Sequence, residues 1–275
     1  MTIRMIVTDL DDTLLRTDAT LSARTVEVLS RARAKGAVVV LASGRMTRAM
    51  LPYAVQLGVT APMIAYNGAV LAHPESGRPT WSMPVPAADA RRIAELAEGL
   101  GLHLQAYCDD EYYFPADNEF SDRYAAAIGV RGRACGRPLT GWIDRSCDKL
   151  LAIDTPARIQ EVLPIFRAEL GGRLNMMTSR PHYLEFTHPK ATKAAALDSL
   201  ASGLGVTPDQ IVAFGDGQND VPMLQYAALS YAPKNAKPDV RAMASAEMPS
   251  NDDDGVARIV QALIEQGRIG KVGAW

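Results

Sequence analysis

The stretch IRMIVTDLDDTLL, residues 3–15, indicates the fold of this chain more clearly than any other. It opens with a short, mainly apolar run that is typical of a buried strand in a parallel sheet. The run stops at three acids, Asp9, Asp11 and Asp12. Because side chains alternate along an extended chain, we expect the carboxylates of Asp9 and Asp11 to leave the strand on the same side. Two carboxylates so close repel each other unless a cation such as hydrated Mg²⁺ lies between them.

A second acidic cluster strengthens this interpretation. Taken alone, the D-x-D-x-T pattern fits a solvated acidic turn as well as it fits a metal site. Downstream, however, the apolar run IVAF at 211–214 ends in the glycine-bracketed loop GDGQND at 215–220. The carboxyl ends of parallel strands meet at one edge of the sheet, so Asp216 and Asp220 are expected near Asp9. Two acidic clusters at one edge predict a magnesium site.

Composition limits the class of protein. The chain has 275 residues, 48% of them apolar, which suits one large domain or two modest ones with a sizeable core. Its 29 Lys and Arg residues nearly balance 31 Asp and Glu residues, for a net charge of −2, and no long basic run occurs. This balance argues against nucleic acid or an anionic membrane as the main partner.

The three cysteines, Cys108, Cys135 and Cys147, show neither C-x-x-C spacing nor an even count. We therefore expect no disulfide framework, no zinc site and no chemical role for them. No stretch approaches the roughly 18 apolar residues of a membrane span, and Asp9 precedes any apolar segment long enough for export. We expect a cytoplasmic protein, a monomer or small homo-oligomer, whose partner is a small molecule.

Strand-like and helix-like segments alternate along the first part of the chain. The run AVVVLA at 37–42 ends on Ser43-Gly44-Arg45, and a third strand-like run at 63–66 stops at Asn67-Gly68. Helix-like segments separate these runs. This rhythm predicts a doubly wound parallel sheet, an α/β fold of the Rossmann-like kind, with ligands bound at the carboxyl ends of its strands. Asp9, Ser43 and Asn67 would then share one edge.

The rhythm changes at PTWSMPVP, residues 79–86, where three prolines indicate a linker. Beyond it, helix-like segments alternate with hairpin-like pairs, which predicts a separate α+β unit over 83–188. The first rhythm returns near Pro189, with a helix expected from Thr192 whose second residue is Lys193. We therefore expect a core of residues 1–82 and 189–275 with an inserted cap.

Three further residues suit a phosphoryl group. Such a group needs hydrogen-bond donors and a fixed positive charge directed at its oxygens. The Ser43 hydroxyl, the Gly44 N–H at a helix start and the Lys193 ammonium would supply them. Each residue alone is more often an ordinary turn or a solvated side chain. Only the joint order of Asp, Ser, Lys and Asp along the chain carries the hypothesis.

With these motifs the chain resembles the haloacid dehalogenase-like phosphohydrolases, in particular the Cof-type branch, which carries a large inserted cap of the C2 type. The likeness spans the whole chain, although its motifs lie in the α/β part. The matching stretches are DLDDTLL at 9–15, LASGR at 41–45, AYNGA at 65–69, the lysine of TKAAAL at 192–197, GDGQND at 215–220, KNA at 234–236 and DDGVA at 253–257.

The resemblance implies a role for each matching residue. Asp9 would be the nucleophile that forms an aspartyl-phosphate, and Asp11 the general acid and base. Mg²⁺ would be held by Asp9, Asp216 and either the main-chain carbonyl or the carboxylate of Asp11, with Asp220 in support. The residues implied in phosphate or substrate binding are Ser43, Gly44, Arg45, Asn67, Lys193 and Asn219. Two positions depart from the family pattern, Ala194 after the lysine and Pro233 before KNA.

The expected function is magnesium-dependent hydrolysis of small phosphorylated metabolites, either sugar phosphates or phosphorylated cofactors such as pyridoxal phosphate or flavin mononucleotide. Two alternatives stay open: a phosphotransferase or phosphomutase on the same fold, and a non-catalytic binding protein. The cap would select the leaving group. Its candidate residues are Tyr107, Asp109, Asp110, Glu111, Tyr112, Tyr113 and His182.

Overall fold

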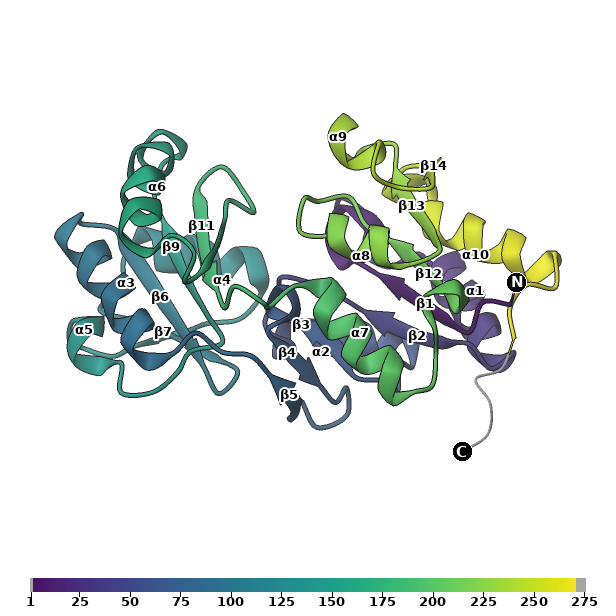
Figure 1. Ribbon diagram of the computed structural model, residues 1–275, viewed down its shortest axis with the longest axis horizontal. Helices are drawn as coiled ribbons and strands as arrows, with labels where there is room; N and C mark the ends of the chain where they lie inside the picture. The colour runs from purple at the N-terminus through teal and green to yellow at the C-terminus, as the bar shows by residue number, and fades with distance from the viewer. Residues whose placement is uncertain (1, 271–275) are drawn as a thin grey trace. The chain divides into compact units, whose positions relative to one another are not determined.

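The computed structural model describes residues 2–270, which form two compact units (Figure 1). Residues 2–81 and 192–270 make up the first unit, the core, and residues 82–191 make up the second, the cap. The boundaries expected from the sequence, after 82 and after 188, lie one and three residues from these divisions. Residue 1 and residues 271–275 of the expected core fall outside the described residues.

The described part of the core contains a five-stranded parallel sheet. Its order is β14-β13-β12-β1-β2, so β1 lies between β12 and β2. Strands β1 and β12 are buried along their whole length, as parallel strands covered on both faces should be. The strands are β1 (Met5–Thr8), β2 (Val38–Leu41), β12 (Ile211–Phe214), β13 (Leu229–Pro233) and β14 (Ala246–Met248).

Helices cover both faces of this sheet (Figure 1). Met5 and Val7 of β1 pack in one apolar cluster with residues of α7 and α8, whereas α1 contacts α10. This arrangement confirms the doubly wound α/β core. Ser22 caps α1 by accepting a hydrogen bond from the Thr25 N–H, and Gly58, at φ 60°, ends α2. The helices are α1 (Ala23–Ala34), α2 (Thr47–Leu57), α7 (Lys193–Gly203), α8 (Val221–Tyr226), α9 (Pro238–Arg241) and α10 (Gly255–Glu265).

The strand predicted at 63–66 does not join the parallel sheet as a full member. It belongs to a three-stranded sheet made of β3 (Met63–Ala65), β4 (Val70–Ala72) and β5 (Pro79–Ser82). Strand β3 pairs antiparallel with β4, and one parallel bridge between Ala42 and Ile64 connects it with the end of β2. The expectation of a third parallel strand is wrong in this respect, because the chain reverses after β3 and pairs back on it.

Strand β5 occupies the first half of the segment that the prolines mark as a linker. Pro79 is its first residue, a position that an edge strand tolerates because no N–H is needed there. The Thr80 hydroxyl donates to the Leu71 carbonyl of β4 at 3.3 Å. The interpretation of the whole segment as a linker is therefore wrong for 79–82.

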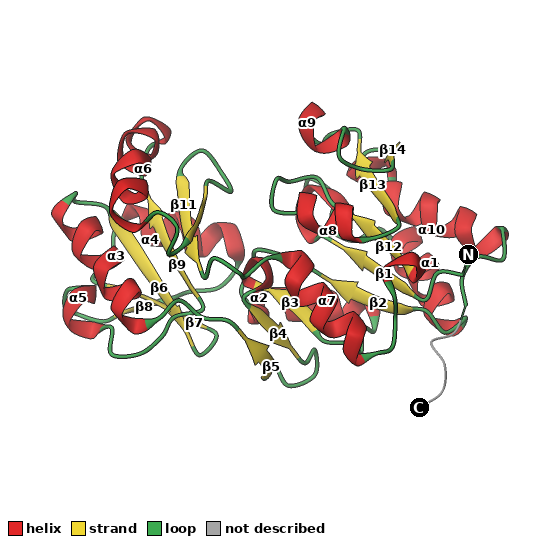
Figure 2. Cartoon of the chain, viewed as in Figure 1, coloured by secondary structure: helices red, strands yellow, loops and turns green. Residues whose placement is uncertain are grey.

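The cap is an α+β unit, as expected (Figure 2). Its sheet has the order β10-β11-β9-β6-β7-β8 and is antiparallel except between β7 and β8. The strands are β6 (His103–Cys108), β7 (Glu111–Phe114), β8 (Arg133–Ala134), β9 (Lys149–Ile153), β10 (Asn175–Met177) and β11 (Tyr183–Thr187). The helices are α3 (Ala87–Gly99), α4 (Glu119–Ile128), α5 (Leu139–Trp142) and α6 (Pro156–Leu170).

The two faces of the cap sheet differ in chemistry. One face packs its apolar side chains against α3 and α6 and forms the core of the cap. The other face carries a buried polar layer in which the Lys149 ammonium pairs with Glu185 at 3.2 Å and lies 4.8 Å from the centre of the Tyr107 ring. Tyr124 of α4 packs its ring on Tyr183 of this face.

The three cysteines are free thiols. Cys108 and Cys147 are buried in the apolar core of the cap, where their Sγ atoms lie 3.1 Å apart. Cys135 is partly buried, and its Sγ donates to the Phe114 carbonyl at 3.2 Å. Their lack of a chemical role stays a prediction.

No helix within residues 2–270 has both the length and the apolar character that a membrane crossing requires.

The carboxyl group of Asp148, just before β9, gives the cap a predicted pH dependence. Burial raises the pKa of Asp148 to about 7, and the carboxylates of Asp110 and Asp109 add to this rise. The pKa in the folded state is then higher than in the unfolded chain, near 3.9, so folding stability is lost as the pH rises from about 4 to about 7. We expect Asp148→Asn to raise the thermal unfolding midpoint at pH 8 and to change it less at pH 5.

The matched control is Asp144→Asn, because the Asp144 side chain in the same loop is 80% exposed. This control should change the midpoint little at either pH. A shift of equal size at pH 5 and pH 8 in Asp148→Asn would contradict the charge argument.

Candidate active site

The site begins where β1 ends. Asp9 is extended, and its main-chain N–H donates to the Phe214 carbonyl of β12 at 2.9 Å, which continues the pairing of the two strands. Residues 10–14 then form a single wide turn, closed by a hydrogen bond of 2.8 Å from the Leu15 N–H to the Leu10 carbonyl. The first acid of the motif therefore ends a strand, and the acids after it lie in a turn.

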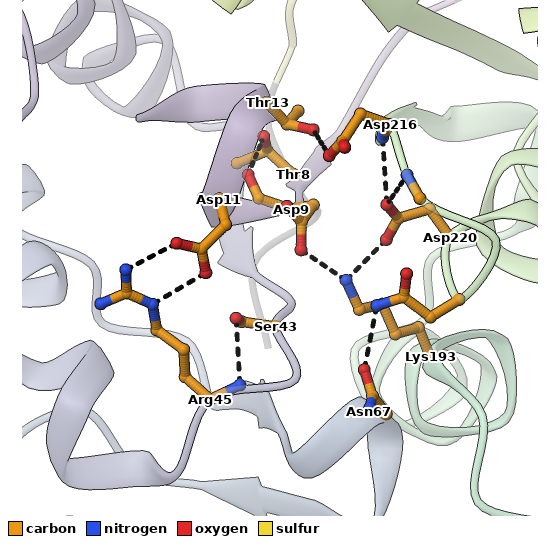
Figure 3. A network of polar contacts seen from close by, with 12 residues as sticks. Thr8, Asp9, Asp11, Thr13, Ser43, Arg45, Asn67, Lys193, Asp216 and Asp220 are labelled. Atoms are coloured by element: carbon orange, nitrogen blue, oxygen red, sulfur yellow. Dashed lines mark hydrogen bonds and ion pairs between the residues drawn. The ribbon is translucent and has the colours of Figure 1, made fainter. Parts of the chain in front are cut away.

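This turn separates the two carboxylates that were expected side by side. The turn begins at Leu10, between the two acids, so the alternation of an extended chain does not continue past Asp9. The Asp9 carboxylate contacts Lys193, whereas the Asp11 carboxylate contacts Arg45 (Figure 3). The two acids thus contact different cations, and their departure from the strand on the same side stays a prediction.

Lys193 carries the central positive charge of the site. It is the first residue of α7, and the preceding Thr192 caps this helix by accepting from the Ala195 N–H. Its fully buried ammonium donates to Asp9 Oδ1 at 2.5 Å and to Asp220 Oδ1 at 2.6 Å (Figure 3). Burial lowers the pKa of Lys193, but the two carboxylates outweigh this effect and raise it, so the side chain stays charged.

Gly68 sets the position of this lysine. Its φ is 97°, and a Cβ built on it would lie 2.1 Å from the Thr192 carbonyl oxygen. Only glycine allows the backbone at the start of α7 to approach so closely. The AYNGA motif therefore fixes where Lys193 begins its helix.

Asp220 organises the loop that follows β12. Its Oδ1 accepts from Lys193, and its Oδ2 accepts from the main-chain N–H groups of Asp216 and Gly217 at 3.0 and 2.9 Å. A Cβ on Gly215 would lie 2.4 Å from the Asp220 Cβ, so the loop closes tightly around this side chain. Both carboxylate oxygens are engaged, which makes Asp220 an anchor for the loop.

Asp216 extends from the same loop toward the β1 turn. The Thr13 hydroxyl donates to Asp216 Oδ1 at 2.6 Å. Burial raises the pKa of Asp216 to about 7, and the Asp220 charge adds to this rise, while the Thr13 hydrogen bond opposes it. Burial also raises the pKa of Asp9 well above its usual value, although Lys193 opposes this rise.

Three carboxylates are crowded at this point. Oxygens of Asp9, Asp216 and Asp220 lie within 4.8 Å of one another. When ionised they carry −3, and Lys193 adds +1, which leaves a local charge of −2. A divalent cation would balance this charge, and carboxylate oxygens are the ligands that Mg²⁺ prefers. The donor set therefore fits the expected ion.

The residues that would hold such an ion differ in part from the expected set. The Asp11 carboxylate is outside the cluster, and Arg45 engages both of its oxygens. Asp220 is inside the cluster, but Lys193 and the loop N–H groups occupy its oxygens. Asp9 and Asp216 thus remain as direct carboxylate ligands. A contribution from the Asp11 main-chain carbonyl stays a prediction.

Asp11 and Arg45 form a two-point ion pair. Arg45 Nε donates to Asp11 Oδ2 at 2.8 Å, and Arg45 Nη2 donates to Asp11 Oδ1 at 2.6 Å. The pair is only partly buried, with 15% of the Arg45 and 36% of the Asp11 side chain exposed. Arg45 was expected near the substrate; in the structure its guanidinium is committed to Asp11.

The remaining predicted residues meet beside β2. The Ser43 N–H donates to the Ile64 carbonyl, and the Asn67 N–H donates to the Ser43 carbonyl at 3.0 Å. Asn219 Nδ2 donates to Asn67 Oδ1 at 3.0 Å, which ties this strand end to the acidic loop. A Cβ on Gly44 would lie 2.9 Å from Asn67 Oδ1. Residues from three sequence motifs thus converge, as their shared position at strand ends suggests.

The comparisons with known proteins agree with this geometry. The sequence pattern of the haloacid dehalogenase-like hydrolases matches residues 6–260. The chain belongs to this hydrolase family. Its fold is also that of a haloacid dehalogenase-like hydrolase from Bacteroides thetaiotaomicron, with a TM-score of 0.87, 28% identity and coverage of 95% of this chain and 99% of that one. The crystal structure of TM0651 from Thermotoga maritima matches with a TM-score of 0.85 and 33% identity over 94% and 97% of the two chains.

Relatives of this hydrolase are named as phosphatases. The Bacillus subtilis 5-amino-6-(5-phospho-D-ribitylamino)uracil phosphatase YitU is 28% identical, with 94% of this chain and 96% of that protein covered. The Escherichia coli pyridoxal phosphate phosphatase YbhA is 26% identical, with 94% and 98% covered. The prediction of an enzyme of the phosphatase type in this family is confirmed.

Two asparagines support the β1 turn of the hydrolase, and the sequence reasoning gave them no role. Asn235 Nδ2 donates to the Asp12 carbonyl at 2.7 Å, and Asn251 Nδ2 donates to the Leu15 carbonyl at 3.0 Å. The KNA motif was the available signal for Asn235. Pro233, the unusual residue beside it, is the last residue of β13, and its carbonyl accepts from the Ala236 N–H.

The cap candidates of this hydrolase have structural contacts of their own. Tyr107 and Tyr112 are buried and stack on each other with ring centres 5.4 Å apart. Tyr113 packs on Trp142 at 4.3 Å. The other candidates are Asp109, which pairs with Arg145, Glu111, which pairs with Arg133, His182, which contacts Tyr183, and Asp110. A role of any of them in substrate selection stays a prediction.

Replacing the buried lysine tests its place in the site. Lys193→Met leaves the carboxylates of Asp9 and Asp220 buried without their cation, so we expect the free energy of unfolding to fall by about 3–5 kcal/mol. Phosphatase turnover should be lost at the same time. Urea unfolding followed by fluorescence measures the first effect, and a phosphate-release assay measures the second.

The control separates stability from chemistry. The double variant Lys193→Met/Asp220→Asn also loses one of the two buried negative charges. Its free energy of unfolding should therefore regain much of what Lys193→Met loses, while turnover stays absent. A Lys193→Met protein as stable as the parent would contradict the role given to this ion pair.

Proposed function

We propose that this chain is a magnesium-dependent phosphatase that hydrolyses small phosphorylated metabolites through an aspartyl-phosphate on Asp9. The observation that carries the proposal is the buried pair of Asp9 and Lys193, with a separation of 2.5 Å. Lys193 fixes one oxygen of Asp9 and opposes the rise in its pKa, which favours the ionised form that attacks phosphorus. The same ammonium supplies positive charge where a transferring phosphoryl group gathers negative charge.

In the first step, an oxygen of Asp9 attacks phosphorus, the P–O bond to the leaving group breaks, and Asp11 gives its proton to the leaving oxygen. In the second, Asp11 takes a proton from water, and this water attacks the phosphorus of the aspartyl-phosphate. The bond to Asp9 breaks and inorganic phosphate leaves. The Ser43 hydroxyl, the Gly44 N–H and the Lys193 ammonium would bind the phosphoryl oxygens in both steps.

Mg²⁺ would be held by Asp9 and Asp216, in the loop that Asp220 anchors. When bound, it would supply positive charge to the phosphoryl oxygens and reduce the repulsion between these carboxylates. Asn219 and Asn67 would hold the loop against the end of β2 through their hydrogen bond of 3.0 Å. Arg45 would orient the Asp11 carboxylate through the two hydrogen bonds of their ion pair.

The substrate class is proposed from the relatives. Two of them are named for phosphate esters of a pyridoxal cofactor and of a ribityl compound. Phosphorylated sugars and cofactors are accordingly the esters to test first, with the cap as the unit that selects among them. A phosphotransferase would give the phosphoryl group to a second hydroxyl compound instead of water, and a product assay in the presence of sugars separates the two.

Removal of the metal provides one test. We expect hydrolysis of an aryl phosphate at neutral pH to stop in excess EDTA and to return with added Mg²⁺. Mg²⁺ should also raise the thermal unfolding midpoint of the parent protein, because it relieves repulsion within the carboxylate cluster. Asp216→Asn should weaken that stabilisation. Full turnover in excess EDTA would overturn the metal assignment.

Replacing Asp9 and replacing Asp11 should have different effects on turnover and on the covalent phosphate. Asp9→Asn should abolish turnover and covalent phosphate, because an amide cannot form the acyl phosphate. Asp11→Asn keeps the nucleophile but loses the proton donor and acceptor, so turnover should fall by roughly a hundred to ten thousand-fold. With an activated aryl ester, whose leaving group needs no proton, Asp11→Asn should still accumulate phosphate on Asp9.

Mass spectrometry after a short reaction locates that phosphate on the peptide that contains residue 9. An adduct on another residue, or parental turnover in Asp9→Asn, would overturn the mechanism.

A further inference from the structure

We propose that Tyr53 is a positioning residue that holds the Arg45 guanidinium in the orientation in which it fixes Asp11. This inference rests on the proposed function, because it assigns Tyr53 to the group that moves the proton. Tyr53 belongs to α2 and to none of the sequence motifs of the family resemblance.

The first step of the argument is the geometry of the Asp11 carboxylate. Asp11 lies in a turn, followed by Asp12 at a φ of 57°, and 36% of its side chain is exposed. Such a side chain has little packing to fix its rotamer. Arg45 takes both of its oxygens, at 2.6 and 2.8 Å, and a planar guanidinium that binds two oxygens defines the plane of the carboxylate. The direction of the proton donor thus depends on the direction of Arg45.

The second step is what holds Arg45. Arginine is long, and ordering it is opposed by the rotamer freedom that it loses. Its guanidinium carbon lies 5.3 Å from the centre of the Tyr53 ring, within the range of a cation–π contact. The nitrogen that does not contact Asp11, Nη1, faces the Tyr53 hydroxyl at 3.4 Å. Tyr53 therefore offers Arg45 both an aromatic ring face and a hydrogen-bond acceptor, on the side of the guanidinium that does not contact Asp11.

The third step is what holds Tyr53. Its hydroxyl donates to the Ala19 carbonyl at 3.2 Å. Ala19 has a φ of 60° in a tight turn, in which the Arg16 N–H donates to the Thr20 carbonyl at 3.0 Å and the Ala19 N–H donates to the Arg16 carbonyl at 2.8 Å. This turn follows the Asp9 motif directly in the chain, so Tyr53 links α2 with the segment that carries Asp11. Its own half-buried position makes it a replaceable side chain and not a part of the apolar core.

The test compares esters that differ in their need for a proton. In rapid-mixing experiments with the full-length protein and Mg²⁺, the phosphorylation step is measured with an alkyl phosphate and with an activated aryl phosphate. Tyr53→Leu should slow the step about tenfold with the alkyl ester, because a misplaced acid loses part of its contribution. With the aryl ester the rate should stay within about twofold of the parent. Tyr53→Phe, which keeps the ring, should have a smaller effect.

Two comparisons give the proposal its controls. In the Asp11→Asn background, Tyr53→Leu should add nothing, since both changes act on the same group. Tyr226→Leu removes another partly exposed tyrosine of the core, whose hydroxyl donates to Asp198, and should leave the ratio of the two ester rates unchanged. Thermal unfolding midpoints of all variants show whether they fold.

The outcomes separate this inference from the proposed function. An equal loss with both esters, or a loss that adds to that of Asp11→Asn, would reduce Tyr53 to a structural residue and overturn the inference. A parental rate ratio in folded Tyr53→Leu would overturn it too, with the proposed function intact. If Asp11→Asn itself does not distinguish the two esters, both the role of Asp11 and this inference fail.

Discussion

A single buried ammonium, that of Lys193, joins three parts of the core that lie far apart in the sequence. Removing such a group from water is unfavourable by several kcal/mol unless it is paired. Lys193 is also the first residue of α7, where the helix dipole disfavours a cation. Because the Lys193 ammonium is buried at this position, it needs the carboxylates of Asp9 and Asp220 as its partners. Their ion pairs bring the end of β1, the loop after β12 and the start of α7 together.

The site contains two electrostatic groups with different properties. The cluster around Lys193 is buried and has an excess of negative charge when its carboxylates are ionised, which suits a bound cation. The pair of Asp11 and Arg45 is neutral in sum and partly exposed. In the proposed mechanism Asp11 gains and loses a proton in each cycle, and its position outside the cluster keeps these charge changes away from the proposed ion. The wide turn after Asp9 produces this separation.

Local patterns were sufficient to predict most elements and most residues of the site. The apolar runs of β1, β2 and β12 each end in polar residues, and the parallel sheet brings those ends together. The direction of the Asp11 side chain could not be predicted, because it depends on the turn that begins at Leu10 and on Arg45, 34 residues away. The antiparallel sheet of β3, β4 and β5 was missed for a similar reason: a run such as MIA has the same composition whichever strand it pairs with.

Buried polar groups need hydrogen-bond partners in the polar layer of the cap as well. The partners of His103 there identify the tautomer of its ring. Burial lowers the pKa of His103 to about 4, so its ring is neutral. Asn118 cannot reverse its amide, because its Oδ1 caps α4 by accepting from the N–H groups of Phe120 and Ser121. Its Nδ2 therefore donates to His103 Nδ1 at 3.0 Å, and Nδ1 is the acceptor. The proton of the neutral ring then lies on Nε2.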